Sequence, residues 1–469
     1  MKLQSEAHRN QALAAGPRPT SGRIGKNSSL SVDRLMLVAL VGPAVAGVLR
    51  KLTPTQPVQI EALPVSIFLA LVFFGLVKVN KNQASVAYGW IVSWIALVAI
   101  YAVPAFAIDT MLGIQALLLG AGTPMLGLAF LTYGRPGDSM KFVRAAKVFV
   151  SVIALQFPLG IVMLVFGNDA LPSVFRANAI ELLAGKEFRI GQATLAGYFT
   201  TAPVNSIASL CAFGFASALV LRSRSSKERL VQLAIALMIL AVIWMTARRG
   251  ALFSAIFIAF ILLAIEIRVH RGRLIFALFA ASPVAVFSLA LFWDRVNSVI
   301  FGERMVLLSE GQLDIGERIN AIFLKFVVEW VNLAPFGNFT GYASGAGKAF
   351  EVRDLSMAAE VGAAMIVAEN GVLGLILFTA IFIILQIEMI RRIKKSGQYW
   401  CGPLVALHFV LFVLFFFKEN SVLFPGLIGS LCYWSLPGLV AVGTSEIASA
   451  GNWRTTRAGA DRYGRERRR

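Results

Sequence analysis

The amino-acid sequence predicts an all-α polytopic membrane protein with about twelve transmembrane helices and a long outer loop between helices 9 and 10. Two observations predict this fold class. The chain is 57% hydrophobic and only 15% charged, with a mean hydropathy of +0.73. Its apolar residues also gather in blocks of about 20, the length that crosses a bilayer as a helix. A soluble domain would need polar surface helices that this sequence lacks.

The apolar blocks divide the chain into a membrane domain and two tails. Residues 1–34 are polar and basic and are expected to form a disordered cytoplasmic tail, whereas 444–469 form a second basic tail. The membrane domain is expected at 35–443. Its predicted spans are 35–49, 60–79, 86–108, 111–133, 145–166, 202–221, 229–247, 250–267, 273–293, 361–388, 399–417 and 421–443.

Lysine and arginine predict the orientation of these spans, because basic loops stay on the cytoplasmic side of a membrane. With the N-terminus inside, 30 of the 44 basic residues fall in the cytoplasm. An even number of spans then places both termini there. The net charge of +19 therefore does not require a nucleic-acid partner. The basic residues set the orientation of the spans and can contact anionic lipid headgroups. The two large outer regions, 167–201 and 294–360, are expected to hold short helices lying against the membrane.

Arg248 and Arg249 break the charge pattern, because the topology places their tight hairpin on the outer face. Small neighbours such as Thr246 and Gly250 leave both guanidinium groups uncrowded. The functional interpretation is an anion clamp, since a guanidinium presents a planar fork of donors that matches phosphate oxygens. The alternative is that both side chains extend to the phosphates of membrane lipids.

Arg189 begins a second segment of interest, which enters the sixth helix from outside. Pro203 and Asn205 in this segment suit a helix entry. Taken alone, Arg189 is equally well explained as an ordinary loop arginine without a functional role.

Glu360 lies at the outer mouth of the tenth helix, ahead of Gly371 and Gly374. The glycine pair, spaced by three residues, is expected to let another backbone approach closely. The functional interpretation of Glu360 is a general base that takes a proton from a hydroxyl group. Alternatively, it only stabilises the N-terminus of the helix through the helix dipole.

Histidine, cysteine and acidic residues predict no metal or cofactor site. His8 and His270 fall on the cytoplasmic side and His408 falls within a helix, so none is expected to act as an outer base. The outer loops show no Asp-x-Asp pair suited to a divalent metal. The cysteines have no metal-ligand or disulfide spacing and fall inside apolar blocks, at Cys211, Cys401 and Cys432.

In order and spacing, these segments resemble the O-antigen polymerase and ligase family of membrane glycosyltransferases over roughly residues 186–390. In the ligases a His occupies the position of Glu360, so its replacement favours a polymerase. The pieces that carry the resemblance are Arg189-x-Gly191 with Pro203-x-Asn205, then Thr246-Ala-Arg-Arg-Gly-Ala251, then the stretch from Arg318 through Trp330, Pro335 and Gly337 to Gly371-x-x-Gly374.

The resemblance implies polymerisation of undecaprenyl-pyrophosphate-linked oligosaccharides for O-antigen, capsule or exopolysaccharide. The reaction would be inverting, would need no metal or cofactor, and would occur on the periplasmic face of the bacterial inner membrane. Regions 167–201 and 294–360 become periplasmic loops. Arg189, Arg318, Arg248 and Arg249 are implied to bind the substrate, with Glu360 and the two adjacent arginines in catalysis. The implied partners are the lipid-linked glycan, membrane lipid and a chain-length regulator protein, with no nucleic acid.

Two other functions remain open at this stage. A ligase would transfer the glycan to a different acceptor. A secondary transporter would carry ionisable residues at mid-depth in the membrane, and few such residues stand inside the apolar blocks. A structural membrane protein is a third alternative.

The orientation can be tested with reporter fusions at Gly341 and at the C-terminus. We expect a periplasmic-type signal from the Gly341 fusion and a cytoplasmic-type signal from the C-terminal fusion, because of the distribution of basic residues. Cytoplasmic-type activity at Gly341 would contradict the predicted topology.

Overall fold

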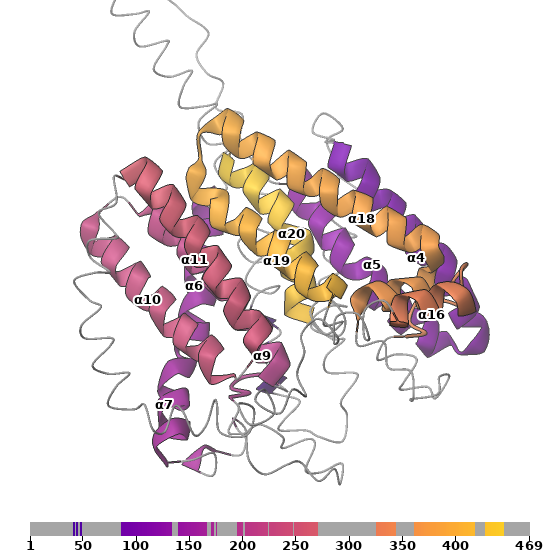
Figure 1. The fold of residues 1–469 in the computed structure, drawn as a ribbon, viewed down its shortest axis with the longest axis horizontal. Coiled ribbons are helices and arrows are strands. Elements are labelled where there is room, and N and C mark those ends of the chain that lie inside the picture. The colour runs from indigo at the N-terminus through magenta and orange to yellow at the C-terminus, as the bar shows by residue number, and fades with distance from the viewer. Residues whose placement is uncertain are drawn as a thin grey trace, which may run out of the picture. The chain divides into compact units, whose positions relative to one another are not determined.

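The computed structural model describes residues 86–133, 139–166, 195–199, 202–223, 225–246, 248–270, 325–343, 361–417 and 427–444, with short pieces inside 41–48 and 170–175. All of these residues belong to one unit of the chain, Val32–Arg469. This described part is helical and contains no strand (Figure 1). The tail expected at 1–34, nearly all of the tail expected at 444–469, and the spans expected at 60–79 and 273–293 lie outside the described residues.

Most of the described residues lie in long apolar helices. Seven helices in this part are long and apolar enough to cross a membrane, which indicates a multi-pass membrane protein. Outside the short pieces at 41–48, the α-helices of the described part are α4 (Val86–Ile108), α5 (Thr110–Tyr133), α6 (Ser139–Ala154), α7 (Gln156–Phe166), α9 (Ala202–Arg222), α10 (Ser226–Met245), α11 (Arg249–His270), α16 (Lys325–Leu333), α18 (Gly362–Ser396), α19 (Gly402–Phe417) and α20 (Leu427–Thr444). One of the seven spans, Phe142–Met163, runs across two consecutive helices, α6 and α7.

Two helices differ from the expected spans for local reasons. The expected span 145–166 is divided at Leu155 between α6 and α7. Pro158 explains the division, because a proline inside a helix removes one hydrogen bond and clashes with the carbonyl four residues earlier. α18 continues past the expected end at 388 to Ser396. Lysine and arginine are good helix formers and are favoured near a helix C-terminus, so the basic run extends the helix.

Helix α9 is surrounded by other helices on nearly all sides. It contacts α6, α10, α11, α19 and α20, and 94% of its span is buried. A helix that is apolar all round is expected in such a position. Small residues such as Ala208, Ala212 and Ala216 line it and are all buried. Such residues let neighbouring helices approach closely, which is how helices associate where no water drives them together.

One end of the bundle is held by ion pairs between α6, α10 and α11. Arg229 Nη1 lies 3.3 Å from Glu266 Oε1, and the Glu266 side chain is fully buried. Lys147 Nζ lies 2.8 Å from Glu228 Oε1 in a more exposed pair. A buried carboxylate without a cation would be strongly unfavourable, so the Arg229–Glu266 pair fixes how α10 lies against α11.

The same end carries cation–π contacts to the turn between α18 and α19. The Arg222 guanidinium lies 4.7 Å from the centre of the Trp400 ring, and that of Arg268 lies 5.8 Å from the Tyr399 ring. Gly443, near the end of α20, also packs against Trp400. The described helix ends that carry these residues, next to loops predicted to be cytoplasmic, therefore meet at one end of the helices, which is called the basic end below.

Candidate functional site

Helix α18 is interrupted at Gly371, and this break is the centre of the candidate site. Gly371 has φ 68° and ψ −174°, a conformation that glycine adopts readily and other residues rarely do. In an unbroken helix the N–H of Val372 would donate to the carbonyl of Ala368. Here Val372 N donates instead to Pro335 O, at 2.9 Å. The interrupted backbone therefore finds its partner in a different segment of the chain.

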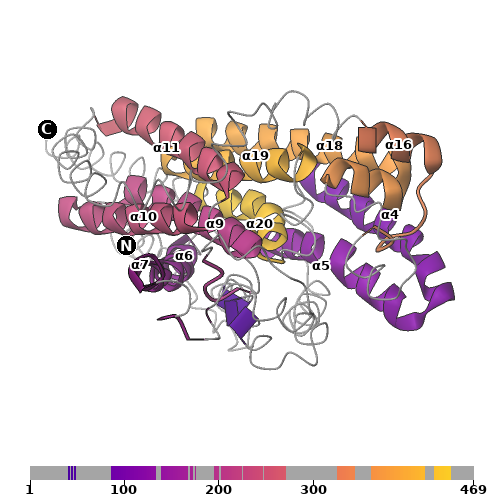
Figure 2. The same ribbon diagram turned by 60° about the horizontal axis from the view of Figure 1, so that its bottom comes forward.

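The partner segment is the loop 334–343, which follows α16 (Figure 2). Asn338 takes over the Ala368 carbonyl that Val372 leaves. It donates to Ala368 O from its backbone N at 2.9 Å and from Nδ2 at 3.0 Å. The loop thus supplies new partners for the Val372 N–H and the Ala368 carbonyl, one on each side of the break. In a membrane, where water cannot serve, such replacement is required for a helix to break.

Two glycines make this docking possible. A Cβ on Gly337, which has φ 76°, would lie 2.5 Å from the backbone N of Gly371. A Cβ on Gly371 would lie 2.6 Å from the carbonyl carbon of Phe336. The close backbone approach predicted for Gly371 is therefore confirmed. Gly374 behaves differently, because a Cβ there would first meet Asn370 of its own helix.

Three polar side chains are buried around the break. Glu369, Asn370 and Thr340 are each no more than 3% exposed. Glu369 Oε1 accepts a hydrogen bond from Ala343 N at 3.2 Å, so its carboxylate holds the end of the loop. Thr340 Oγ1 lies 3.1 Å from Asn370 Oδ1 and can donate to it. Buried polar groups are costly unless paired, so these contacts fix the loop in one position.

The loop is also bound to α4. Thr340 N donates to Tyr101 O at 2.9 Å, and Thr340 Oγ1 lies 3.2 Å from Val98 O, a second acceptor for its proton. Gly120 of α5 packs against the Thr340 side chain. Loop 334–343 therefore connects the break in α18 to α4 and α5.

A second junction joins the segment 195–199 to α9 and α10. Leu195 N donates to Met245 O, the last residue of α10, at 3.1 Å. Asn205 Nδ2 of α9 donates to Leu195 O at 2.9 Å. Pro203 and Asn205 lie in the first turn of α9, as the sequence predicts for a helix entry. The segment that begins with Arg189 in the sequence therefore meets the segment that holds Arg248.

Gln156 of α7 packs against the segment 195–199 at this second junction. It is fully buried, and Gly197, with φ 56°, has no room for a Cβ beside it. Tyr198 N lies 3.4 Å from Gln156 Oε1. Burial raises the pKa of the Tyr198 phenol above its ordinary value.

Both junctions lie at the end opposite the basic end. Helices α11 and α19 run antiparallel, because Gly402 lies against Ile265 and Phe409 lies against Phe257. The residue before α11, Arg248, is therefore at the same end as the C-terminus of α19.

The start of α18 is found there as well. Gly362 packs against Phe415, close to the last residue of α19. Val361 is the N-cap of α18 and directly follows Glu360 in the sequence. The described parts of the three motif-bearing segments therefore share one end of the helices.

Of the predicted site residues, the structure describes only Arg248 fully. Its side chain is exposed and forms no hydrogen bond or ion pair with any described residue. Arg249 is the first residue of α11, but its side chain is not among the described ones. Glu360, Arg189 and Arg318 lie outside the described residues, so their roles stay predictions. Within the described part no group of His, Cys, Asp and Glu residues could hold a metal ion.

Glu369, Asn370 and Thr340 were not predicted from the sequence. For Glu369 and Asn370 the available signal was their adjacency directly before Gly371, in a stretch (362–387) that has no other charged residue. Ionisable residues inside a membrane helix are rare and usually have a specific role.

Comparison with models of known protein families gave no match to this chain, and comparison with curated protein sequences gave none either.

The docking of the loop at Gly371 can be tested with Gly371→Ala, using Gly397→Ala as the matched control. Both glycines have φ near +69°, but a Cβ on Gly397 would meet nothing within 4 Å. The control should cost about 1–2 kcal/mol from the left-handed backbone alone. Gly371→Ala should cost a further ~1–3 kcal/mol, because the added atom collides with the loop backbone and because Gly371, with ψ −174° against 11° for Gly397, lies in a region that is essentially restricted to glycine. Thermal unfolding in detergent measures both, and equal losses would contradict a tightly docked loop.

Proposed function

We propose that this protein is a polysaccharide polymerase of the bacterial inner membrane. It would transfer a growing glycan from undecaprenyl pyrophosphate to a hydroxyl group of the next lipid-linked repeat unit, on the periplasmic face. The observation that supports this best is the shared location of the motif-bearing segments. Segments 195–205, 245–248 and 335–374 are distant in sequence, but their described parts lie at one end of the helices.

The proposed chemistry suits the residues at that end. The acceptor oxygen forms a bond to the anomeric carbon, the bond from that carbon to the pyrophosphate oxygen breaks, and the hydroxyl proton passes to a carboxylate. Pyrophosphate is already a good leaving group, so the enzyme mainly stabilises the negative charge that develops on it. Fixed cationic donors next to a low-dielectric membrane do this well.

Arg248 is the best-placed described group for this task. It is exposed and directly precedes α11, whose first backbone N–H groups carry a partial positive charge. A pyrophosphate at this position would meet both the guanidinium fork and the helix N-terminus. Arg249, Arg189 and Arg318 are proposed to complete the clamp.

Glu360 is proposed as the general base rather than Glu369. Glu369 is 2% exposed and its carboxylate holds the loop through Ala343 N, so it acts as a positioning residue. Glu360 comes directly before the N-cap Val361 at the same end of α18. A ligase that uses another acceptor remains the nearest alternative, because the same donor site would serve it.

A secondary transporter is a second candidate that a specific observation favours. Transporters of several folds bind their substrates at broken helices, and α18 is broken at Gly371 beside the buried Glu369. Against this candidate, loop 334–343 is docked at the break and bonds the Val372 N–H and the Ala368 carbonyl, so these two groups are not open to a solute. Substrate-driven exchange of labelled solute across proteoliposomes without glycan synthesis would favour the transporter.

The anion clamp predicts that Arg248→Lys lowers polymerisation although the charge is kept. Lysine cannot reproduce the bidentate contact of a guanidinium, and losing one such donor costs on the order of 10²–10³ in rate. Arg144→Lys, at an exposed position of α6, is the control and should retain full activity. The measurement is the length distribution of polymer made from purified lipid-linked repeat units. Wild-type polymer from Arg248→Lys would exclude Arg248 from the clamp.

The proposed base predicts that Glu360→Gln loses polymerisation but retains donor binding. Glutamine keeps the shape and hydrogen bonding of the side chain but cannot accept the proton. Glu360→His should be tolerated better, because it restores a proton acceptor. Glu329→Gln in α16 controls for the loss of a carboxylate in the same outer region. If Glu360→Gln makes polymer at nearly the wild-type rate, Glu360 is not the base, and Glu317 or Asp354 becomes the next candidate.

A further inference from the structure

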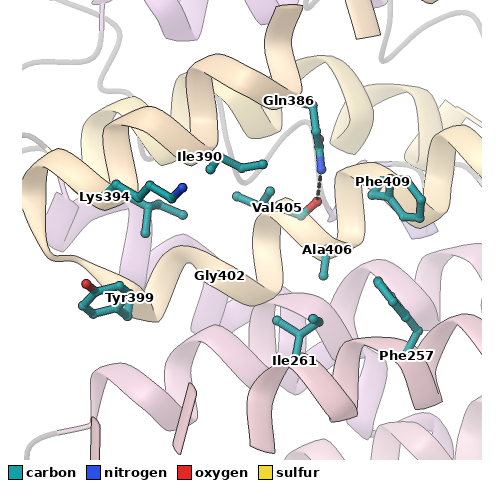
Figure 3. Close-up of a pocket in the computed structure, with 11 residues that line it drawn as sticks. Phe257, Ile261, Gln386, Ile390, Lys394, Tyr399, Gly402, Val405, Ala406 and Phe409 are labelled. Carbon is teal, nitrogen blue, oxygen red and sulfur yellow. Dashed lines mark hydrogen bonds between the residues drawn. The ribbon is translucent and has the colours of Figure 1, made fainter. Parts of the chain in front are cut away.

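A groove opens between α11, α18 and α19, away from both junctions described above. Its volume is about 380 Å³. Figure 3 shows Phe257 and Ile261 of α11 on one side, and Ile390 of α18 with Ala406 and Phe409 of α19 on the others. The groove reaches toward the basic end, where Lys394 and Tyr399 also line it.

The walls of the groove are apolar and accessible from outside the helices. Phe257 is 40% exposed, and Phe409 and Ile390 are each 39% exposed. The Phe257 and Phe409 rings lie 5.9 Å apart across the space between α11 and α19. From Gln386 to Lys394 α18 rises by about 12 Å, enough to accompany a large part of one acyl chain.

The side-chain amide of Gln386, on the wall of the groove, is already hydrogen-bonded within the protein. Gln386 Nε2 donates to Val405 O at 3.2 Å, and Gln386 Oε1 lies 2.9 Å from His408 Nδ1 (Figure 3). These contacts turn the amide inward, so Gln386 adds no ligand to the groove. The middle of the groove is suited to a hydrocarbon chain rather than to a polar solute.

The end of the groove is strongly positive. Lys394 extends its ammonium group toward the groove and forms no hydrogen bond or ion pair with a described residue (Figure 3). Arg268 lies at the same end, over the ring of Tyr399. The nearby carboxylate of Glu388 is paired with Arg392 at 2.7 Å and so does not neutralise Lys394.

We propose that this groove binds a diacyl phospholipid with an anionic headgroup. One acyl chain lies between Phe257, Ile390 and Phe409, and the headgroup phosphate meets Lys394 and Arg268. Charge complementarity selects this occupant, because basic pockets between membrane helices attract anionic lipid headgroups. The site is distinct from the proposed glycan site, since it lies toward the basic end and uses none of the motif segments.

Lipid titration followed by native mass spectrometry of the detergent-purified full chain tests the proposal. The probes are phosphatidylglycerol and phosphatidylcholine with the same acyl chains. The wild-type protein should bind phosphatidylglycerol more tightly. Lys394→Gln should weaken this binding about fivefold, the effect of one basic residue near a lipid headgroup. Lys395→Gln is the matched control, because Lys395 carries the same charge one residue further on but does not line the groove.

A second variant tests the apolar part. Ala406→Phe should fill the groove and lower binding of both lipids, and its thermal unfolding shows whether the fold is kept. Equal binding by Lys394→Gln and Lys395→Gln would overturn the proposal, as would retention of both lipids by a folded Ala406→Phe variant.

Other occupants give different results. A polyprenyl phosphate that displaces phosphatidylglycerol at a much lower concentration would assign the groove to a prenyl lipid and overturn the proposal. A disulfide formed in membranes between Phe409→Cys and a cysteine introduced within 280–287 would show that the chain covers its own groove, which would also overturn it.

Discussion

The candidate site depends on the requirement that every backbone polar group in a membrane has a partner inside the protein. Gly371 breaks α18, and the break would leave the Val372 N–H and the Ala368 carbonyl without their usual bond. Pro335 and Asn338 supply both replacements. Loop 334–343 is therefore needed to complete the hydrogen bonding of α18. The same loop bonds to α4 through Thr340 and directly follows α16, so it also fixes where these two helices lie.

The two ends of the helices are built from different chemistry. At the basic end, two arginines are paired or stacked: Arg229 with buried Glu266, and Arg222 over Trp400. Lys394, which lines the groove at that end, is a cation without such a contact to a described residue. At the opposite end Arg248 is exposed beside the start of a helix. Paired charges hold structure, whereas an accessible arginine can still bind an anion from outside. This difference is the physical reason to look for the proposed chemistry at the end that holds the glycine-bearing loop.

Much of the helix layout followed from the sequence, because the bilayer fixes the length of an apolar helix. The division of the span 145–166 at Leu155 could have been predicted from Pro158. It was missed because the whole block is apolar, which indicates one continuous membrane helix. Close approach at Gly371 was predicted correctly. Its left-handed backbone was not, since a glycine inside an apolar run fits a continuous helix equally well.

The partners of the break could not be derived from local sequence. Thr340 meets Val98, 242 residues away, and no periodicity in either segment encodes that contact. The roles of Glu360, Arg189 and Arg318 rest on sequence resemblance alone, whereas Arg248 has an observed position.

The exchange of hydrogen bonds at Gly371 has a consequence for how the chain folds. The ribosome makes α4 first, then loop 334–343, and only afterwards α18, so the contacts of Thr340 with Val98 and Tyr101 join segments made more than 200 residues apart. The part of α18 before the break, 362–370, reaches its final hydrogen bonding only when that loop is in place, because the Ala368 carbonyl and the Val372 N–H both bond to the loop. Closure of this region is therefore a late assembly step, and a chain stalled before it exposes the polar groups of Glu369 and Asn370 to lipid.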